Sequence, residues 1–552
     1  MSKPKERGAR TAAAGTIVPC LPGVSRARLT LVIILSAHFA LLLAMGLARH
    51  WSNLTSLNDL GIYDQAVWGT LHGKWFLNTS NTFGVEANCL GFHFNPILLA
   101  FVPLYALWPA AEWFAIAQAF ALSIAAWPIF LLASRVHASE RLGVLWALAY
   151  LCNPFLINAA AWDFHPVVLA VPLIAAGLLA VELKNFRLLL ACCLLLLLIQ
   201  EQFGITVAGL GGLWAIRYRQ WWRGVLLTAV GFLHAALVLG VIMPALSPSG
   251  NHIFISGSGL PARYNWLGSS FGAIAGTLVL HPLKVVSTIL GLPNAITYLV
   301  ELALPFLGLF LVAPFWLLPG IADLAANMLS AVPMPRGISS YHSVTLVPVL
   351  TVAAIQGVRR LATRFAGDPV TRLTNYVLCF TLTLGYFFSP LPLTGAANPW
   401  APAHLRGAPD PALPKVRAVV GDHASVSAQA NIAAHFSQRG QVYLFPDKAG
   451  TADAVVLWLD TPTRKLLPHS RGFIGTTAHH LQLRPAEYLA AIECLLNNRG
   501  YGVVLWEDPW LVLRWGAAAG SEDRQVREKL QGLCKAWAVP EKEYAAAIRA
   551  CR

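Results

Sequence analysis

Apolar segments long enough to cross a membrane recur along the first 395 residues of this 552-residue chain. A helix of about 20 apolar residues spans a hydrocarbon core of roughly 30 Å. Hydrophobic residues make up 56% of the chain and charged residues only 12%, a balance that excludes most soluble folds. Residues 188–199 (LLLACCLLLLLI) have no polar helical face, so lipid or protein must surround them. The sequence therefore predicts an α-helical polytopic membrane protein.

The predicted organisation has three parts. Residues 1–27 form a basic N-terminus, residues 28–395 a transmembrane domain, and residues 396–552 a domain of soluble character. Two polar outer loops, 49–92 and 247–292, interrupt the transmembrane domain. The predicted transmembrane segments cover residues 28–48, 112–134, 142–158, 167–183, 188–200, 203–216, 224–246, 294–313, 315–332, 343–358 and 371–393.

Clusters of basic residues predict the orientation of these segments, because loops rich in Lys and Arg stay in the cytoplasm. All the clusters fall on one side if the N-terminus is cytoplasmic and residues 94–109 do not cross. That stretch is short and broken by three prolines, and irregular backbone is tolerated at membrane depth only where protein covers it. We therefore predict eleven crossings, a re-entrant or interfacial stretch at 94–109, and an extracytoplasmic C-terminal domain. The basic clusters are Arg135 and Arg141, Lys184 and Arg187, Arg217 to Arg223, and Arg359 to Arg372.

The net charge of +14 raises the question of nucleic-acid binding. The basic residues gather at segment ends, where they set topology and meet anionic lipid, so we expect the bilayer as partner and no nucleic acid. The nine cysteines form no CxxC pair and no Cys/His cluster at metal-ligand spacing. Outside the cytoplasm, one disulfide among Cys494, Cys534 and Cys551 is allowed.

The C-terminal domain is predicted to be a small α/β fold. A helix is expected at residues 485–497, with Gly500 just beyond its end. Two β-type runs, 501–506 and 511–515, flank a Glu-Asp-Pro-Trp turn and predict a hairpin. No glycine-rich nucleotide fingerprint accompanies the strands, and the last thirty residues are charged and expected to be helical. Further short apolar runs lie at residues 416–420, 442–445 and 454–459.

The first outer loop carries two acids, Asp59 and Asp64, five positions apart. If a helix lying along the membrane follows Asp59, that residue is its natural N-cap, and Asp64 lies one turn in, beside Trp68. The functional interpretation is a carboxylate poised for base or metal work beside the bilayer. Both interpretations stay open, and so does the use of a divalent metal.

Two further motifs combine aromatic residues with histidine and proline, at residues 92–96 (FHFNP) and 162–166 (WDFHP). Both lie where a helix starts at the outer face, so helix capping and an interfacial aromatic belt would explain them. The second polar group in each motif favours more than capping. We therefore predict substrate-binding roles for His93, Asp163 and His165.

Glu201 stands between two glutamines inside an apolar run. A carboxylate at membrane depth is unfavourable unless it is paired, hydrated or protonated, so Glu201 is a candidate catalytic residue. Arg336 lies at another outer helix start, shortly before Tyr341 and His342, and all three are candidate substrate-binding residues. The planar guanidinium binds oxyanions through paired hydrogen bonds, which predicts a phosphate contact for Arg336; an ordinary exposed loop arginine is the alternative.

The motifs DLGIYDQAVW, HFNP, WDFHP, QEQFG and RGISSYH, in this order, resemble a family of bacterial polytopic proteins known as domain of unknown function 2079 (DUF2079). The resemblance covers about residues 40–460 and implies a multi-pass protein of the bacterial inner membrane. The layout of that family is similar to the type C glycosyltransferases (GT-C), which combine many helices, an acidic first outer loop and a soluble outer domain. Protein O-mannosyltransferases and the aminoarabinose transferases of lipid A share this plan.

Carried over, the resemblance implies that Asp59 or Asp64 matches the first-loop acid that serves those enzymes as base or metal ligand. This chain departs from their pattern, because they usually carry two adjacent acids whereas these two lie five positions apart. The departure leaves a single catalytic acid and an open question of metal use.

The leading hypothesis is a glycosyltransferase that uses a polyprenyl-phosphate-linked sugar at the outer face. Asp64 or Asp59 would deprotonate an acceptor hydroxyl, Glu201 and His165 would order the site, and Arg336 would hold the donor phosphate. One alternative is a transporter or flippase in which Glu201 and the His/Asp pairs form an intramembrane acidic relay. Another is a non-catalytic envelope scaffold whose C-terminal domain binds a partner. None of these hypotheses fixes the sugar or the oligomeric state.

Overall fold

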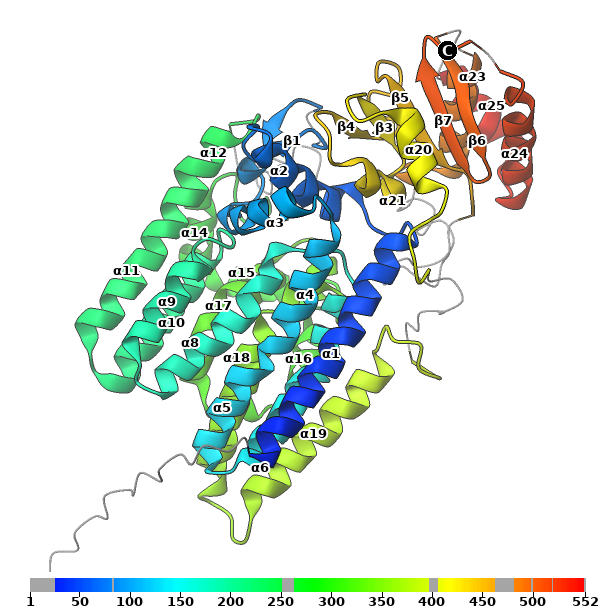
Figure 1. Cartoon of the computed structure of the whole chain (residues 1–552). Coiled ribbons are helices and arrows are strands. Elements are labelled where there is room, and N and C mark those ends of the chain that lie inside the picture. The colour runs from blue at the N-terminus through cyan, green and yellow to red at the C-terminus, as the bar shows by residue number, and fades with distance from the viewer. Residues whose placement is uncertain are drawn as a thin grey trace, which may run out of the picture.

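A bundle of helices and an α/β domain packed on one of its ends make up the computed structural model of this chain (Figure 1). The predicted helical membrane domain and the small C-terminal sheet are both present. Most of the basic N-terminus, residues 1–24, lies outside the described residues. The structure describes residues 25–81, 84–250, 263–396, 406–461, 481–497, 500–518 and 520–550.

Three helices of 26 residues are long and apolar enough to cross a membrane: α1 (Arg26–Trp51), α4–α5 (Glu112–His137) and α11–α12 (Trp221–Leu246). Two bent pairs are further candidates. α6 (Glu140–Leu151) and α7 (Pro154–Ala160) meet at 53°. α14 (Phe271–Leu280) and α15 (Pro282–Gly291) meet at 99°. By length and composition, the described residues thus hold three spans, or five if each bent pair counts as one, and the eleven predicted crossings stay a prediction.

The remaining predicted segments form shorter helices. Prolines 305, 314 and 319 fall in the stretch between α16 and α17, which breaks into short 3-10 turns, since proline supplies no backbone N–H to a helix. The bounds of these helices are α8 (Ala170–Glu182), α9 (Phe186–Leu196), α10 (Phe203–Tyr218), α16 (Ala295–Ala303), α17 (Ile321–Leu329), α18 (Leu346–Ala362) and α19 (Pro369–Phe387).

Two predicted loops have defined structure. Residues 94–109 form a 3-10 segment, Pro96–Phe101, and the short helix α3 (Val102–Leu107), which lies across the end of the bundle nearest the α/β domain (Figure 1). The length and position agree with an interfacial stretch. Residues 247–292, expected as a polar loop, instead contain the apolar helices α14 and α15 in their second half.

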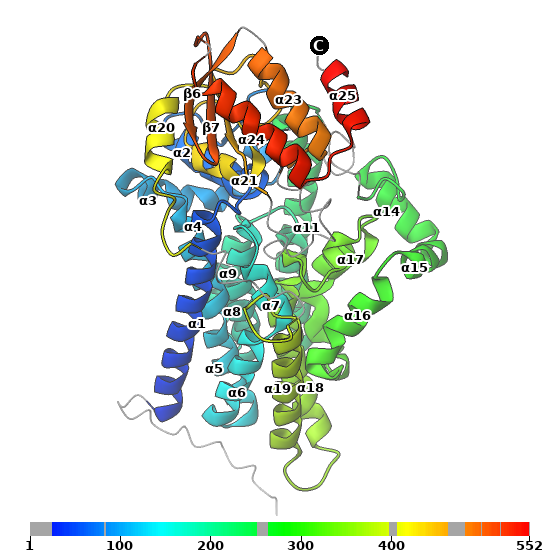
Figure 2. The same cartoon turned by 90° about the vertical axis from the view of Figure 1, so that its right-hand side faces the viewer.

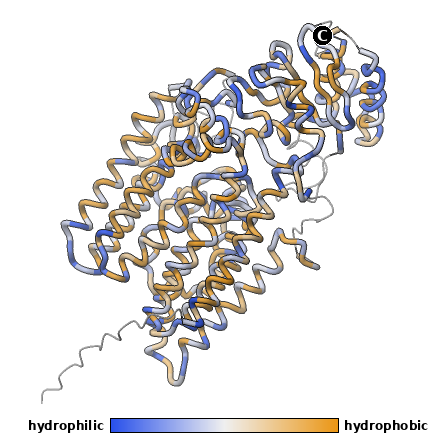
Figure 3. The backbone as a smooth tube through the Cα atoms, viewed as in Figure 1, coloured by the Kyte–Doolittle hydropathy of each residue, from blue (hydrophilic) through white to orange (hydrophobic). Residues whose placement is uncertain are grey.

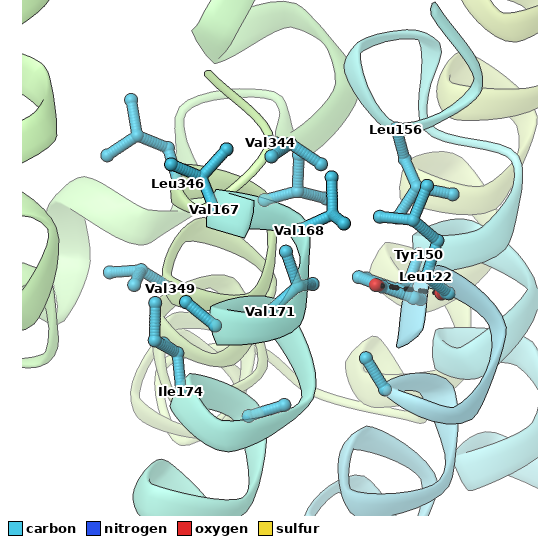
Figure 4. Packing of buried hydrophobic residues seen from close by; sticks show 14 of the residues in the cluster. Leu122, Tyr150, Leu156, Val167, Val168, Val171, Ile174, Val344, Leu346 and Val349 are labelled. Atoms are coloured by element: carbon cyan, nitrogen blue, oxygen red, sulfur yellow. Dashed lines mark hydrogen bonds between the residues drawn. The ribbon is translucent and has the colours of Figure 1, made fainter. Parts of the chain in front are cut away.

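The bundle core joins helices that are distant in the sequence. Figure 4 shows Val167, Val168 and Val171 at the start of α8 packed against Val344, Leu346 and Val349 at the start of α18. The hydroxyl of buried Tyr150 in α6 donates to the carbonyl of Leu122 in α4 at 3.0 Å. This packing holds the helix starts at one end of the bundle in fixed positions.

Glycines allow α10 and α11 to approach closely. A Cβ atom on Gly204 would lie 2.6 Å from the carbonyl oxygen of Gly231, and one on Gly211 would lie 2.7 Å from that of Gly224. Small residues at helix contacts serve this purpose in membrane proteins.

The basic loops gather at the end of the bundle away from the α/β domain, where Figure 3 shows hydrophilic connections between hydrophobic helices. There Glu182, at the end of α8, pairs with Arg217 at 2.6 Å and lies 3.7 Å from Arg359. Glu182 thus offsets part of the positive charge at this end of the bundle.

The C-terminal domain is built on a five-stranded sheet of order β4-β3-β5-β7-β6. β3 is parallel to β4 and β5, and the predicted hairpin β6–β7 pairs antiparallel with β5 through β7. The predicted helix at 485–497 and the helical C-terminus are confirmed. The bounds are β3 (Val426–Ala428), β4 (Val442–Leu444), β5 (Ala454–Trp458), β6 (Tyr501–Glu507), β7 (Trp510–Trp515), α23 (Pro485–Asn497), α24 (Asp523–Ala536) and α25 (Glu541–Ala550).

Residues 416–420, noted in the sequence only as a short apolar run, lie in helix α20 (Leu413–Val420). Leu413, Val416 and Val420 are buried, and their three- and four-residue spacing is that of one helix face. Among the tail cysteines, Cys494 is disulfide-bonded and Cys534 is a free thiol. Cys551 lies outside the described residues.

Candidate functional site

Asp59 and Asp64 lie where the first outer loop meets the bundle and the C-terminal domain. The loop folds into a π-helical turn (Leu57–Gly61), helix α2 (Ile62–Leu71) and two short paired strands, β1 (Leu77–Asn78) and β2 (Ala87–Asn88). The hydroxyl of Thr79 donates to the Val442 carbonyl at 2.8 Å and accepts from the Val442 amide at 3.0 Å, so it pairs with edge strand β4. The loop and the C-terminal domain therefore form one framework.

Asp59 faces His165. The carboxylate Oδ1 of Asp59 lies 3.4 Å from Nε2 of His165, and the Asp59 side chain is 29% exposed. Asp59 is not the helix N-cap suggested by its position, because the turn begins earlier and the hydroxyl of Ser56 accepts from the Asn58 amide. The carboxylate thus points to a basic partner rather than to the backbone.

The tautomer of His165 follows from its other nitrogen. Nδ1 lies 2.9 Å from the carbonyl oxygen of Asp163. A carbonyl only accepts, so Nδ1 carries a hydrogen. Nε2 then faces the Asp59 carboxylate at 3.4 Å. The His165 ring stacks on Tyr341, with centroids 3.7 Å apart and an interplanar angle of 21°.

Asp163 links two segments of the chain beside this site. Its two oxygens accept from Nη2 of Arg49 at 2.6 Å and from the Ser56 amide at 2.7 Å, and both charged side chains are buried. These contacts join the end of α1 to the loop before α8. Asp163 is therefore placed to position Asp59 and His165 rather than to meet a substrate.

His342 extends the site beyond Tyr341, with ring centroids 4.2 Å apart. Its Nδ1 lies 2.7 Å from the hydroxyl of Ser340, and its Nε2 lies 3.2 Å from Nη1 of Arg263. The sequence prediction missed Arg263. The only signal for it was a lone arginine beside a tyrosine in the stretch expected to be a polar loop.

Glu201 lies in the connection between the end of α9 and the start of α10. Its carboxylate is 3.0 Å from Nδ1 of His93 and accepts from the Phe94 amide at 3.0 Å. The neighbouring Asn95 donates to the Ile199 carbonyl at 2.6 Å. These contacts offset the free-energy cost of burying the Glu201 carboxylate near the membrane. They also place the two predicted residues, His93 and Glu201, side by side.

Tyr63 of α2 connects the two groups of residues. Burial raises its pKa well above the ordinary value, and the nearby Tyr341, Cys89, Asp59 and Glu201 add to the shift. Its ring also lies edge-on to His165 at 6.2 Å. We call the whole set the outer cluster: Asp59, Tyr63, His93, His165, Glu201, Arg263, Tyr341 and His342.

Asp64 lies on the opposite side of its loop from these contacts and is almost fully buried. Its carboxylate accepts from the hydroxyl of Tyr105 at 2.5 Å, from Nε2 of Gln438 at 3.0 Å, and from the hydroxyl of Ser437. Burial raises its pKa, and these hydrogen bonds oppose the shift. Asp64 thus fastens α2 to α3 and to the C-terminal domain.

Arg336 is buried and bonds to backbone carbonyls. Its Nε donates to Pro293 at 3.1 Å and its Nη1 to Asn327 at 3.0 Å and to Ser330. The alternative of an exposed loop arginine is wrong, because only 1% of the residue is exposed. As for a metal, no three His, Cys, Asp or Glu side chains in the described ranges come together in a way that could hold an ion.

Fold and site together define a polytopic, mostly helical membrane protein with a polar cluster beside its C-terminal domain. The family model described as "Predicted membrane protein (DUF2079)" matches residues 49–480. The chain therefore belongs to the DUF2079 family, and the expected resemblance is confirmed. The match includes the first outer loop and strands β3 to β5 of the sheet, and it ends before β6 and β7.

Comparison with solved structures finds ArnT from Cupriavidus metallidurans. The crystal structure with bound undecaprenyl phosphate is similar at 12% identity and a TM-score of 0.49, over 89% of this chain and 99% of that one. The apo structure is similar at 13% identity and a TM-score of 0.48, over 88% and 98%. No curated protein matches the sequence.

Proposed function

We propose that this DUF2079 protein is a glycosyltransferase that uses a polyprenyl-phosphate-linked sugar at the outer face of the bacterial inner membrane. The observation that carries the proposal is the Asp59–His165 pair. A partly exposed carboxylate faces an imidazole whose other nitrogen is already bonded. In such a pair, a proton taken from a hydroxyl can be held between the carboxylate and Nε2.

In the proposed reaction, an acceptor hydroxyl attacks the anomeric carbon of the donor sugar. The bond from that carbon to the phosphate oxygen breaks, and its electron pair leaves with the polyprenyl phosphate. The hydroxyl proton passes to the Asp59–His165 pair. Stacking on Tyr341 holds the imidazole in place, and Asp163 fixes the backbone beneath it.

Arg263 is proposed as the phosphate contact. It lies at the outer cluster, 3.2 Å from His342, and a guanidinium pairs well with phosphate oxygens. Arg336 is not assigned this role, because its Nε and Nη1 donate to backbone carbonyls. Glu201 with His93 would order the neighbouring edge of the site.

The lipid chain of the donor would lie against α14 and α15, which project from the bundle beside α16 and α17 (Figure 2). None of the α14 side chains is buried, and Val279, Leu280 and Leu283 are more than two-thirds exposed. Trp266, just before α14, donates to the carbonyl of Leu329 at 2.9 Å. An apolar chain on this surface would end near Arg263, three positions before Trp266.

The proposal is tested with the purified protein in lipid nanodiscs that contain undecaprenyl-phosphate-linked hexoses, with release of undecaprenyl phosphate as the readout. His165→Phe keeps a ring against Tyr341 and removes both nitrogens. We expect donor consumption by the native protein and a loss of about a hundredfold in the variant.

The same preparation in sealed vesicles separates the alternatives. Movement of the intact lipid-linked sugar across the bilayer without its consumption would support a transporter or flippase. Neither consumption nor movement, together with retention of another envelope protein, would support a scaffold. Both results would contradict the glycosyltransferase proposal.

A further inference from the structure

A second pocket lies between the helix bundle and the C-terminal domain, on the Asp64 side of the first loop. Its volume is about 160 Å³, and none of the residues of the outer cluster lines it. Its walls come from the end of α1, from α2, from the corner between α3 and α4, from α20, and from the connection between β3 and β4. It is enclosed by segments far apart in the sequence, so it forms only when the C-terminal domain is in place.

The pocket offers a carboxylate from Glu112 and a guanidinium from Arg417 as groups that can bond to a ligand. Asp64 and Gln438 also line it, but they bond to each other at 3.0 Å. The Arg417 guanidinium is held from behind, since its Nε and Nη2 donate to the carbonyl of His435 at 3.0 and 2.8 Å. A guanidinium fixed in this way can bind a ligand without a change in its own conformation.

His435 points to a ligand independently of the cavity itself. The residue is 7% exposed and lines the pocket. One ring nitrogen is close enough to the His50 backbone to bond to it, and the other has no hydrogen-bond partner among the described residues. Its ring is tilted at 39° to that of His50, with centroids 4.2 Å apart. Buried polar atoms without partners are rare in folded proteins and costly, so a partner from outside the chain would stabilise this arrangement.

The chemistry of the walls selects the ligand class. Two carboxylates disfavour an anion, and no three metal-ligating side chains converge here or elsewhere in the described part of the chain. A hydroxyl group both donates and accepts, so a polyol satisfies carboxylate, guanidinium and imidazole together. Trp51 and Trp108 at the rim offer flat apolar surfaces to the C–H face of a ring.

We propose that this pocket binds a neutral sugar ring, either of a free glycan or of a glycolipid headgroup. The site is separate from Asp59 and His165, so the inference stands or falls independently of the proposed transfer reaction. A protein with this second site would recognise one carbohydrate at the domain junction while another is processed at the outer cluster.

Binding is measured on the full-length protein in phosphatidylcholine nanodiscs. The probes are methyl β-glucopyranoside, methyl α-mannopyranoside and N-acetylglucosamine, followed by saturation-transfer NMR and calorimetry. A second arm uses nanodiscs that contain a monoglucosyl diacylglycerol. Saturable binding of a free glycoside supports a free glycan as the source, and binding confined to the second arm supports a glycolipid headgroup. Absence of saturable binding in both arms would overturn the proposal.

The decisive variant is His435→Phe, which keeps a ring against His50 and removes both nitrogens. We expect binding to weaken about tenfold, as for the loss of a buried hydrogen bond to a ligand, while the thermal midpoint is unchanged or higher. Glu112→Gln is the second variant, because the amide oxygen can still accept from Trp51. Trp222→Ala is the matched control, since Trp222 is 66% exposed and begins α11 at the basic end of the bundle. Undiminished binding in both pocket variants would contradict the proposal.

Discussion

Asp59 and Asp64 lie in one loop, five positions apart, yet their carboxylates have different surroundings. Asp59 is partly exposed and faces an imidazole. Asp64 is buried and accepts from a tyrosine, a serine and a glutamine, two of which belong to the C-terminal domain. Position in the first outer loop therefore does not fix the surroundings of a carboxylate. Of the two, only Asp59 is both partly exposed and next to an imidazole.

The first prediction concerns Asp163, which links the end of α1 and the first outer loop to the segment before α8. Asp163→Ala would leave Arg49 buried without its carboxylate partner. Loss of one member of a buried ion pair costs about 3–5 kcal/mol, so we expect the largest loss of thermal stability here. The midpoint of unfolding in detergent measures it, and a midpoint like that of the native protein would contradict the positioning role.

The second prediction sharpens the structural side of the comparison. Asp64→Ala removes the carboxylate that accepts from Tyr105 and Gln438 and leaves Ser437 with only the Ala434 carbonyl. This should cost about 2–3 kcal/mol. The C-terminal domain should also become easier to cleave with protease, because the joint to α2 is lost. An unchanged digestion rate would show that other contacts hold the domain.

The third prediction sharpens the catalytic side. Tyr341→Leu removes the ring that stacks on His165, a contact of about 1 kcal/mol, and should slow transfer roughly fivefold to tenfold. Tyr341→Phe keeps the ring and should retain the rate. Equal losses in both variants would indicate that the hydroxyl matters and not the stack.

The smallest expected effect is on the way the thermal midpoint of unfolding depends on pH. Burial raises the pKa of Asp64 above its ordinary value of 3.8, so the folded chain holds this proton more tightly than the unfolded chain. Its contribution to stability is then greatest at low pH and declines as the pH rises through the window between those two pKa values. Thermal midpoints recorded across that window should decline less in Asp64→Asn, and an identical slope in the two proteins would contradict the shift.

The sequence was sufficient for the family, the helical membrane domain and much of the sheet, because hydropathy and turn residues are local signals. His93, His165, Glu201, Tyr341 and His342 were predicted as site residues because polar groups at outer helix starts are conspicuous in so apolar a chain. The pairing of His93 with Glu201, and the stacking of Tyr341 on His165 and on His342, are findings of the structure.

The rest depended on contacts between distant positions. Ser437 and Gln438 lie more than 370 positions from Asp64, so no local pattern could indicate that they occupy its carboxylate. Arg336 resembles an ordinary loop arginine in sequence, and no local pattern could indicate that the backbone carbonyls of Pro293 and Asn327 hold its side chain. Residues 416–420 are too short to separate a strand from one face of a helix.

The most direct test of the account compares Asp59→Asn and Asp64→Asn in the nanodisc transfer assay, with Glu86→Gln as an exposed acid of the same loop for control. The account predicts that Asp59→Asn lowers the rate of undecaprenyl phosphate release by about a hundredfold or more, with a normal thermal midpoint. Asp64→Asn should lower the rate far less, and Glu86→Gln should leave it unchanged. Full activity in Asp59→Asn, with loss confined to Asp64→Asn, would contradict the assignment of Asp59 and His165 as the reacting pair.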